Sequence, residues 1–167
     1  LSSSIQILPG EAVGIDVKST YHFVLSIVAV WLAQGVPCPV DRRYPDSRKE
    51  FIYTNAGIRK ILVSEELTLH IQDRLNEPIV HAREASFILH TSGSTGEPKG
   101  VIQTHECLIN LICWNTQAYP LDAKEVILQL SSFGFDASFH EVLLAMSLGA
   151  SLIELVLGVT AFVQFDK

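Results

Sequence analysis

The chain has 167 residues, of which 48% are hydrophobic and 18% are charged, and its formal net charge at pH 7 is -6. This composition suffices for the core of one domain, or of part of a larger one, and it excludes wholesale disorder. The acidic balance argues against a general binder of nucleic acids or of anionic membranes. We therefore expect neither a nucleic acid nor a membrane as a partner.

The cysteines and histidines indicate neither a disulfide framework nor a metal centre. Cys38, Cys107 and Cys113 form no C-x-x-C pair, and no two histidines lie at H-x-x-x-H spacing. Such cysteines are typical of reduced core thiols in a cytosolic protein, so we expect a cytoplasmic location and no protein-bound metal. The start of the chain lacks the charged region of a signal peptide, and the long apolar runs are too short or too interrupted to predict a membrane span.

Short apolar runs alternate with amphipathic segments along the chain. The runs that predict strands are residues 12–17, 36–40, 58–64, 85–91, 100–104, 125–130 and 150–157. The segments that predict helices are residues 20–34, 47–55, 64–75, 105–118 and 139–148. Strand–helix alternation with almost continuously apolar strands predicts an α/β fold, a layered sandwich with a largely parallel sheet.

Capping residues support several of these helices. Ser19 or Thr20 can cap the first helix, and Gly35 is expected to end it. The pairs Ser47/Glu50 and Ser138/Glu141 both match the S-x-x-E capping box. Gly149 is expected to form the turn between the last helix and the last strand.

The most informative segment is HTSGSTGEPKGV, residues 90–101, which follows a predicted buried strand. Ligands bind at this edge of open α/β sheets, and glycines let backbone N–H groups approach an anion. Lys99 adds a positive charge suited to phosphate. The candidate phosphate-binding residues are Thr91, Ser92, Gly93, Ser94, Thr95, Gly96 and Lys99. The composition alone leaves open a solvated Ser/Gly hairpin between two strands.

The segment is no Walker A loop, since Lys99 stands between Pro98 and Gly100. Residues 91–101 instead resemble, position for position, the phosphate-binding signature of the adenylate-forming (AMP-binding) superfamily. His105 and Asn110 follow as in that family's H-x-x-x-x-N continuation, and WLAQGVPCPVDRRYPDSR, residues 31–48, resembles its "lkaGaayvPlDpxyPxeR" segment. The resemblance covers about residues 12–155.

The resemblance implies a two-step reaction. A carboxylate attacks the α-phosphorus of ATP, pyrophosphate leaves, and an acyl-adenylate forms. A thiol, usually the phosphopantetheine arm of a carrier domain, then takes the acyl group. Mg²⁺ normally helps to offset the charge of the phosphates. In this family the glycine-rich loop contacts the β- and γ-phosphates, so it would hold the leaving group.

A second segment, SSFGFDASFHEVL (residues 131–143), bears on the substrate. Asp136 lies among phenylalanines, where burying a carboxylate without a cation is costly, although an aspartate also suits the positive end of a helix. F-D-x-S-x-x-E resembles the motif of amino-acid-activating adenylation domains, in which the aspartate pairs with the substrate ammonium. The neighbouring pocket positions of the family fall on Ala137 and His140, and His140 is alternatively an ordinary half-buried histidine.

The resemblance also has limits. Nothing matches the later Y-G-P-T-E and T-G-D segments or the small C-terminal domain with its catalytic lysine, and the tail departs from the family pattern after about Leu155. Residues 1–167 are therefore expected to be the N-terminal part of the large subdomain of an adenylation domain, inactive alone because no opposite wall orients the α-phosphorus. Two alternatives stay open: a fragment of an acyl-CoA or aryl-acid ligase, and a catalytically dead fragment that binds a nucleotide or a partner.

Overall fold

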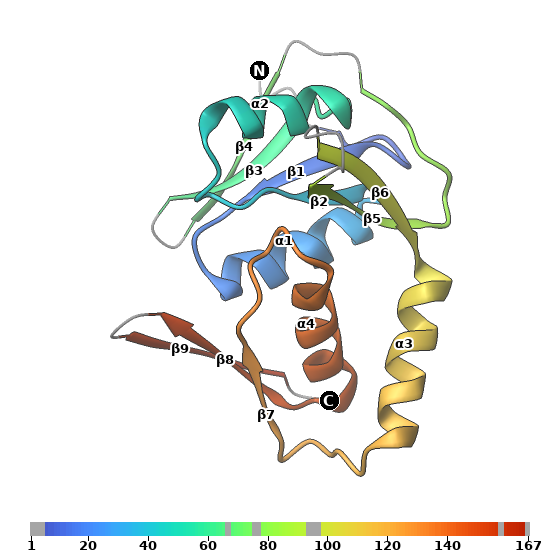
Figure 1. Ribbon diagram of the computed structural model, residues 1–167, viewed down its shortest axis with the longest axis vertical. Helices are drawn as coiled ribbons and strands as arrows, with labels where there is room; N and C mark the ends of the chain where they lie inside the picture. The colour runs from blue at the N-terminus through green and yellow to red at the C-terminus, as the bar shows by residue number, and fades with distance from the viewer. Residues whose placement is uncertain (1–5, 66–67, 75–77, 93–97, 157–158, 166–167) are drawn as a thin grey trace.

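The computed structural model describes residues 6–65, 68–74, 78–92, 98–156 and 159–165 (Figure 1). The elements in chain order are β1 (Ala12–Asp16), α1 (Thr20–Leu32), β2 (Val36–Pro39), α2 (Asp46–Asn55), β3 (Lys60–Glu65), β4 (Thr68–Asp73), β5 (Ala85–Ser92), β6 (Pro98–Thr104), α3 (His105–Ala118), β7 (Val126–Gln129), α4 (Asp136–Leu148), β8 (Ser151–Val156) and β9 (Val159–Gln164).

The first sheet has the strand order β2-β1-β3-β4. β1 pairs in parallel with both β2 and β3, so α1 and α2 are the crossover helices, and β4 closes the edge as an antiparallel strand. The two helices cover opposite faces of this sheet (Figure 1). Alternate residues of β1 divide accordingly, because Ala12 packs in the cluster that contains Ile52 of α2, whereas Val13 packs on Val30 of α1.

A buried ion pair joins the beginnings of β1 and β3. The ammonium of Lys60 lies 2.7 Å from one carboxylate oxygen of Glu11 and 3.0 Å from the other, and both side chains are almost completely enclosed. The Leu8 N–H also donates to Glu11, at 2.7 Å. These hydrogen bonds satisfy the carboxylate inside the protein, as a buried charge requires.

The remaining strands form two further units. β5 and β6 are an antiparallel hairpin that lies beside β2, and β7-β8-β9 is a separate sheet in which β7 and β8 are parallel. Helix α3 leaves the hairpin, and α4 packs between α3 and the β7–β8 pair (Figure 1). The α/β class and the parallel pairing are confirmed, while β4 and β9 make two of the sheets mixed and the β5–β6 sheet is wholly antiparallel.

An aromatic cluster connects these units. The ring of Phe139 on α4 stacks on Phe87 of β5 at 4.0 Å and meets Phe23 of α1 edge-on at 5.7 Å. Phe23 in turn stacks on Phe133, in the loop before α4, at 4.2 Å. Three of these side chains are fully buried, so the hairpin, α1 and α4 share one core.

The predicted helix over residues 64–75 is wrong. Residues 68–73 form strand β4 instead, in which half-buried Leu69 and Ile71 alternate with exposed neighbours. This two-residue period is the signature of a half-buried strand, and it is present in the sequence. The helix at 105–118 and the predicted strands are confirmed.

Both predicted capping boxes are also wrong. Helix α2 begins at Asp46 after Pro45, so Ser47 lies inside its first turn. Helix α4 begins at Asp136, and the Ser138 hydroxyl donates to the Phe135 carbonyl at 2.7 Å. The partner of Glu141 is Ser131, whose hydroxyl donates to the carboxylate at 2.8 Å. Ser138 therefore bonds within the first turn of its own helix, and Glu141 bonds to the loop before α4.

The predicted start of α1 and the predicted end of α4 are confirmed, whereas the predicted end of α1 is wrong by one residue. Ser19 caps α1 as predicted, by accepting from the His22 N–H. The left-handed residue after α1 is Gln34, with φ of 62°, and not Gly35. Gly149 ends α4 in the left-handed conformation with φ of 69°, as predicted.

The three cysteines are free, but only one of them is a core thiol. Cys38 on β2 is buried, and burial raises the pKa of its thiol to about 12. Cys107 and Cys113 are exposed on α3, contrary to the prediction. Their exposure follows from the position of α3, which packs on the rest of the molecule along a narrow face in which only Leu108 and Asn115 are buried.

Candidate functional site

The ends of the hairpin strands carry the described part of the predicted phosphate loop. Thr91 and Ser92 are the last residues of β5, and Lys99 lies opposite Thr91 on β6. All three side chains are exposed and available to a ligand. Gly93, Ser94, Thr95 and Gly96 lie outside the described residues. The sequence allowed two interpretations, a phosphate cradle and a solvated hairpin. Both require a strand before and a strand after residues 93–97, and the structure has β5 and β6 at these positions.

A buried histidine anchors the base of this hairpin. The imidazole Nε2 of His90 lies 3.0 Å from the side-chain oxygen of Asn55, the last residue of α2. Gly100 covers the ring, since a Cβ there would lie 3.3 Å from Nε2. Burial, and secondly the positive charge of Arg48, lowers the pKa of His90 below its ordinary value. A neutral imidazole that donates through Nε2–H to Asn55 fits these surroundings.

The predicted substrate-binding residues lie at the beginning of α4. Asp136 is its first residue and Ala137 its second, and both are exposed, so the phenylalanines around Asp136 do not bury its carboxylate. The carboxylate accepts the Ala137 N–H at 2.8 Å, and its position also suits the positive end of the helix. His140 follows one turn later and is half-buried, and its Nε2 has no hydrogen-bond partner among the described residues.

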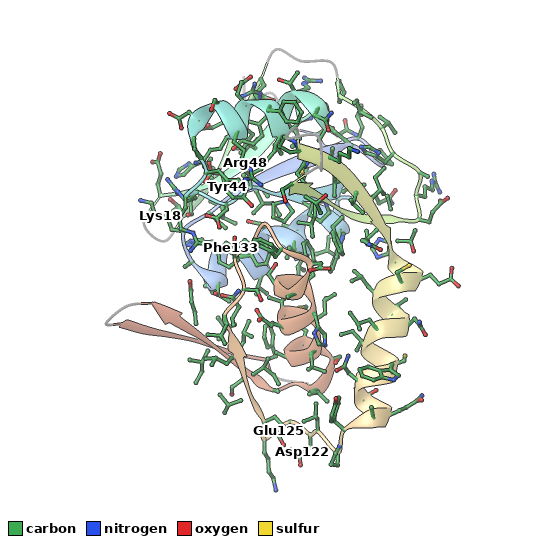
Figure 2. All side chains as sticks on the ribbon, in the orientation of Figure 1. Lys18, Tyr44, Arg48, Asp122, Glu125 and Phe133 are labelled. Carbon is green, nitrogen blue, oxygen red and sulfur yellow. The ribbon has the colours of Figure 1, made fainter. Side chains whose placement is uncertain are left out.

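The loop before α4 is bound to the segment that follows β2. The Ser132 hydroxyl donates to the carboxylate of Asp41, and Gly134 lies against Tyr44, whose hydroxyl would be 2.7 Å from a Cβ at that position. Figure 2 labels Tyr44 and Phe133 in these two neighbouring segments. Burial alone would raise the pKa of Asp41, but hydrogen bonds from Arg43 and Ser132 outweigh it and lower the pKa to about 2. Asp41 is therefore a charged anchor for the loop that leads to Asp136.

These segments line a cavity of about 580 Å³ at one edge of the molecule, where β1, β2 and β7 end. The lining residues are Val17, Lys18, Asp41, Arg42, Arg43, Gln129, Leu130, Ser131, Ser132, Phe133 and Glu154. The volume suits a small organic ligand, and the position at the carboxyl ends of parallel strands is the usual one in α/β proteins.

The described residues set limits on other kinds of site. In the part of the chain that the structure describes, no three histidine, cysteine or acidic side chains come together as a metal site. None of the helices in those residues has the length and apolar character needed to cross a bilayer.

Sequence reasoning missed Asn55, His90 and Asp41 as supports of the site, because each acts through a residue far away in the chain.

The hairpin thus presents two hydroxyls and a lysine, and α4 begins with an exposed carboxylate. The chain belongs to the AMP-binding enzyme family, which matches residues 63–156. This match contains the hairpin, the loop before α4 and α4 itself.

Individual relatives include a synthase from Bacillus. The chain is 32% identical over 174 residues to zwittermicin A synthase ZmaJ of Bacillus cereus, covering 93% of this chain and 33% of that protein. Two solved structures share the fold. One is holo-AB3403, a four-domain nonribosomal peptide synthetase bound to AMP and glycine, with a TM-score of 0.73, 21% identity and coverage of 90% of this chain and 12% of that chain.

The second structure is the N-terminal subdomain of Klebsiella oxytoca NpsA in complex with 3-hydroxybenzoyl-AMSN. Its TM-score is 0.70 at 24% identity, over 92% of this chain and 43% of that chain. The chain thus spans about a third of the length of ZmaJ and less than half of the NpsA subdomain chain. Its fold is that of the N-terminal subdomain of adenylate-forming enzymes.

Proposed function

We propose that this chain belongs to an enzyme that activates an amino acid with ATP as an aminoacyl-adenylate, for transfer to the phosphopantetheine thiol of a carrier domain. The observation that carries the proposal is the exposed carboxylate of Asp136 at the start of α4, in a chain whose β5–β6 hairpin also presents hydroxyls and a lysine. The ammonium group of an amino acid is the natural partner of such a carboxylate, whereas a fatty acid has no group to pair with it.

The hairpin would bind the leaving pyrophosphate. Thr91 and Ser92 offer hydroxyl donors, and Lys99 offers a cation on the opposite strand. In the proposed reaction the substrate carboxylate attacks the α-phosphorus, the bond to pyrophosphate breaks, and the pyrophosphate carries the released negative charge. Donors and cations fixed around that charge lower the barrier.

Mg²⁺ fits this site as a companion of ATP. Mg²⁺ keeps several waters and is usually bound through one or two carboxylates together with substrate phosphates, and in phosphate-binding loops a serine or threonine hydroxyl can also be a ligand. The hydroxyls of Thr91 and Ser92 are oxygen ligands of that kind. Bound there, the ion would offset the charge of the phosphates. The carrier domain is proposed from the four-domain nonribosomal peptide synthetase whose fold the chain shares.

Calorimetric titration of the chain with ATP and Mg²⁺ tests the phosphate part of the proposal. Lys99→Ala should weaken ATP binding about tenfold, because a charge-assisted contact to phosphate is lost. The exposed Lys124, in the turn before β7, serves as the matched control, and Lys124→Ala should bind ATP like the unaltered chain. Equal binding by all three proteins would contradict the proposal.

The substrate class is tested in the same titrations by adding either a pool of amino acids or a pool of fatty acids. Amino acids should change the affinity for ATP, and Asp136→Asn should abolish that response while leaving ATP binding itself unchanged. A response to fatty acids alone would instead favour an acyl-CoA ligase.

A further inference from the structure

Arg48 on α2 has no anionic partner among the residues that the structure describes. Its guanidinium lies 4.0 Å above the ring of Tyr44, and its Nε is buried without a hydrogen-bond partner among the described residues. The neighbouring carboxylates are already engaged. Asp16 is paired with Arg42 and Lys49, Asp41 with Arg43, and Glu50 with Arg74.

The geometry of α2 directs this cation toward the hairpin. Arg48, Ile52 and Asn55 are spaced by four and three residues, so they share one face of the helix. Ile52 is buried on that face, and Asn55 contacts both His90 and Gly100 at the base of the hairpin. Arg48 therefore belongs to the helix face that covers the hairpin, and its charge acts on His90.

The direction of β5 brings the phosphate-binding residues toward Arg48. Helix α2 connects two parallel strands and runs opposite to them, and β5 runs in the same sense as those strands (Figure 1). From Asn55 back to Arg48 the helix covers about 10 Å, and from His90 forward to Ser92 the strand covers about 7 Å in the same direction. The end of β5 thus comes alongside Arg48, while Lys99 lies across the hairpin.

We propose that Arg48 is a second phosphate-binding cation, which holds a polyphosphate oxygen from the α2 side while Lys99 holds the same ligand from β6. A planar guanidinium held flat on Tyr44 suits this role, because it presents paired N–H donors to phosphate and loses little conformational freedom on binding. Figure 2 shows Arg48 and Tyr44 next to one another on the side of the sheet that α2 covers. The inference rests on the proposed phosphate site.

Titration of the chain with inorganic pyrophosphate tests this assignment. Arg48→Gln should weaken the affinity about tenfold, and Arg48→Lys should recover part of the loss, because lysine keeps the charge but not the planar donors. Arg59, an exposed residue between α2 and β3, is the matched control, since Arg59→Gln removes the same charge from the chain. Its affinity should stay within about twofold of the unaltered chain.

An NMR titration of the His90 imidazole adds a readout that a loss of stability alone would not change. Without ligand, Arg48→Gln should raise the pKa of His90, because the positive charge that lowers it is gone. Pyrophosphate should raise the pKa of His90 in the unaltered chain, and at the same concentration it should raise it less in Arg48→Gln, which binds the anion more weakly.

The outcomes separate the inference from the proposed function. If Lys99→Ala weakens pyrophosphate binding while Arg48→Gln behaves like Arg59→Gln, the role of Arg48 is overturned and the phosphate site stands. If the unaltered chain does not bind pyrophosphate, or Lys99→Ala binds it equally well, both proposals fail.

Discussion

Asp41 shows how a single residue joins two segments that are distant in the sequence. Its carboxylate accepts from the Arg43 guanidinium at 2.6 Å and from the hydroxyl of Ser132, 91 residues later. The side chain is almost fully enclosed, and its pKa is lowered from 3.8 to about 2. The charged form therefore favours the folded state, and protonation removes both the ion pair and the acceptor for Ser132.

This residue predicts a pH dependence of stability. Because the folded pKa lies below the unfolded value, the contribution of Asp41 is fully present above about pH 4 and is lost as the pH falls toward 2. In urea unfolding, Asp41→Asn should be less stable than the unaltered chain at pH 7, and the difference should shrink between pH 4 and pH 2.5. Asp73→Asn, at an exposed position, should not show this pattern. A constant difference across the range would contradict the role of Asp41.

At the scale of elements, the end of α1 depends on one left-handed residue. Gln34 has φ of 62° and is exposed, while the Gly35 N–H donates to the Val30 carbonyl at 2.8 Å. The sequence predicts the glycine as the helix terminator, but the chain leaves the helix one residue earlier. Gly35 is required for a different reason, since a Cβ there would lie 2.9 Å from Ile7 and 3.0 Å from Val30.

Gln34→Gly should therefore stabilise the protein by about 0.5–1 kcal/mol, because it relieves the left-handed strain at little cost in packing. Gly35→Ala should destabilise it through the close contacts. Chemical denaturation of both variants measures the two effects, and a loss of stability in Gln34→Gly would show that the backbone there carries no strain.

At the scale of the whole molecule, aromatic packing holds the separate sheets together. Phe139 is fully buried between Phe87 of β5 and Phe23 of α1, so its removal affects the hairpin, the first sheet and α4 at once. Phe135, four residues earlier, is 60% exposed. The two phenylalanines are therefore a matched pair of positions for measuring how much this core contributes to stability.

Phe139→Ala should reduce the free energy of unfolding by about 3–5 kcal/mol, the usual cost of a large cavity, whereas Phe135→Ala should change it little. Thermal or urea unfolding distinguishes the two variants. If they were equally destabilised, Phe139 would not be the link between the sheets.

Much of the fold follows from local patterns. The apolar runs predict the strands, and the amphipathic segment at residues 105–118 predicts α3 with the bounds that the structure shows. The helix predicted over residues 64–75 rests on a weak helical spacing of apolar residues. Leu69 and Ile71 instead alternate with exposed neighbours, as in a strand. The capping boxes failed because the helices begin at Asp46 and Asp136, so Ser47 and Ser138 lie inside the first turn and not at the N-cap.

The sequence by itself determined the α/β class, the strands β5 and β6 and the family, because these depend on residue types at short spacings. Only the tertiary structure decided what surrounds the site. Asn55 meets His90 across 35 residues, Ser132 meets Asp41 across 91, and Arg48 lies on the helix face that covers the hairpin. Such neighbours result from the packing of α2 and α4 against the strands, and no local period in the sequence encodes which distant residues that packing brings together.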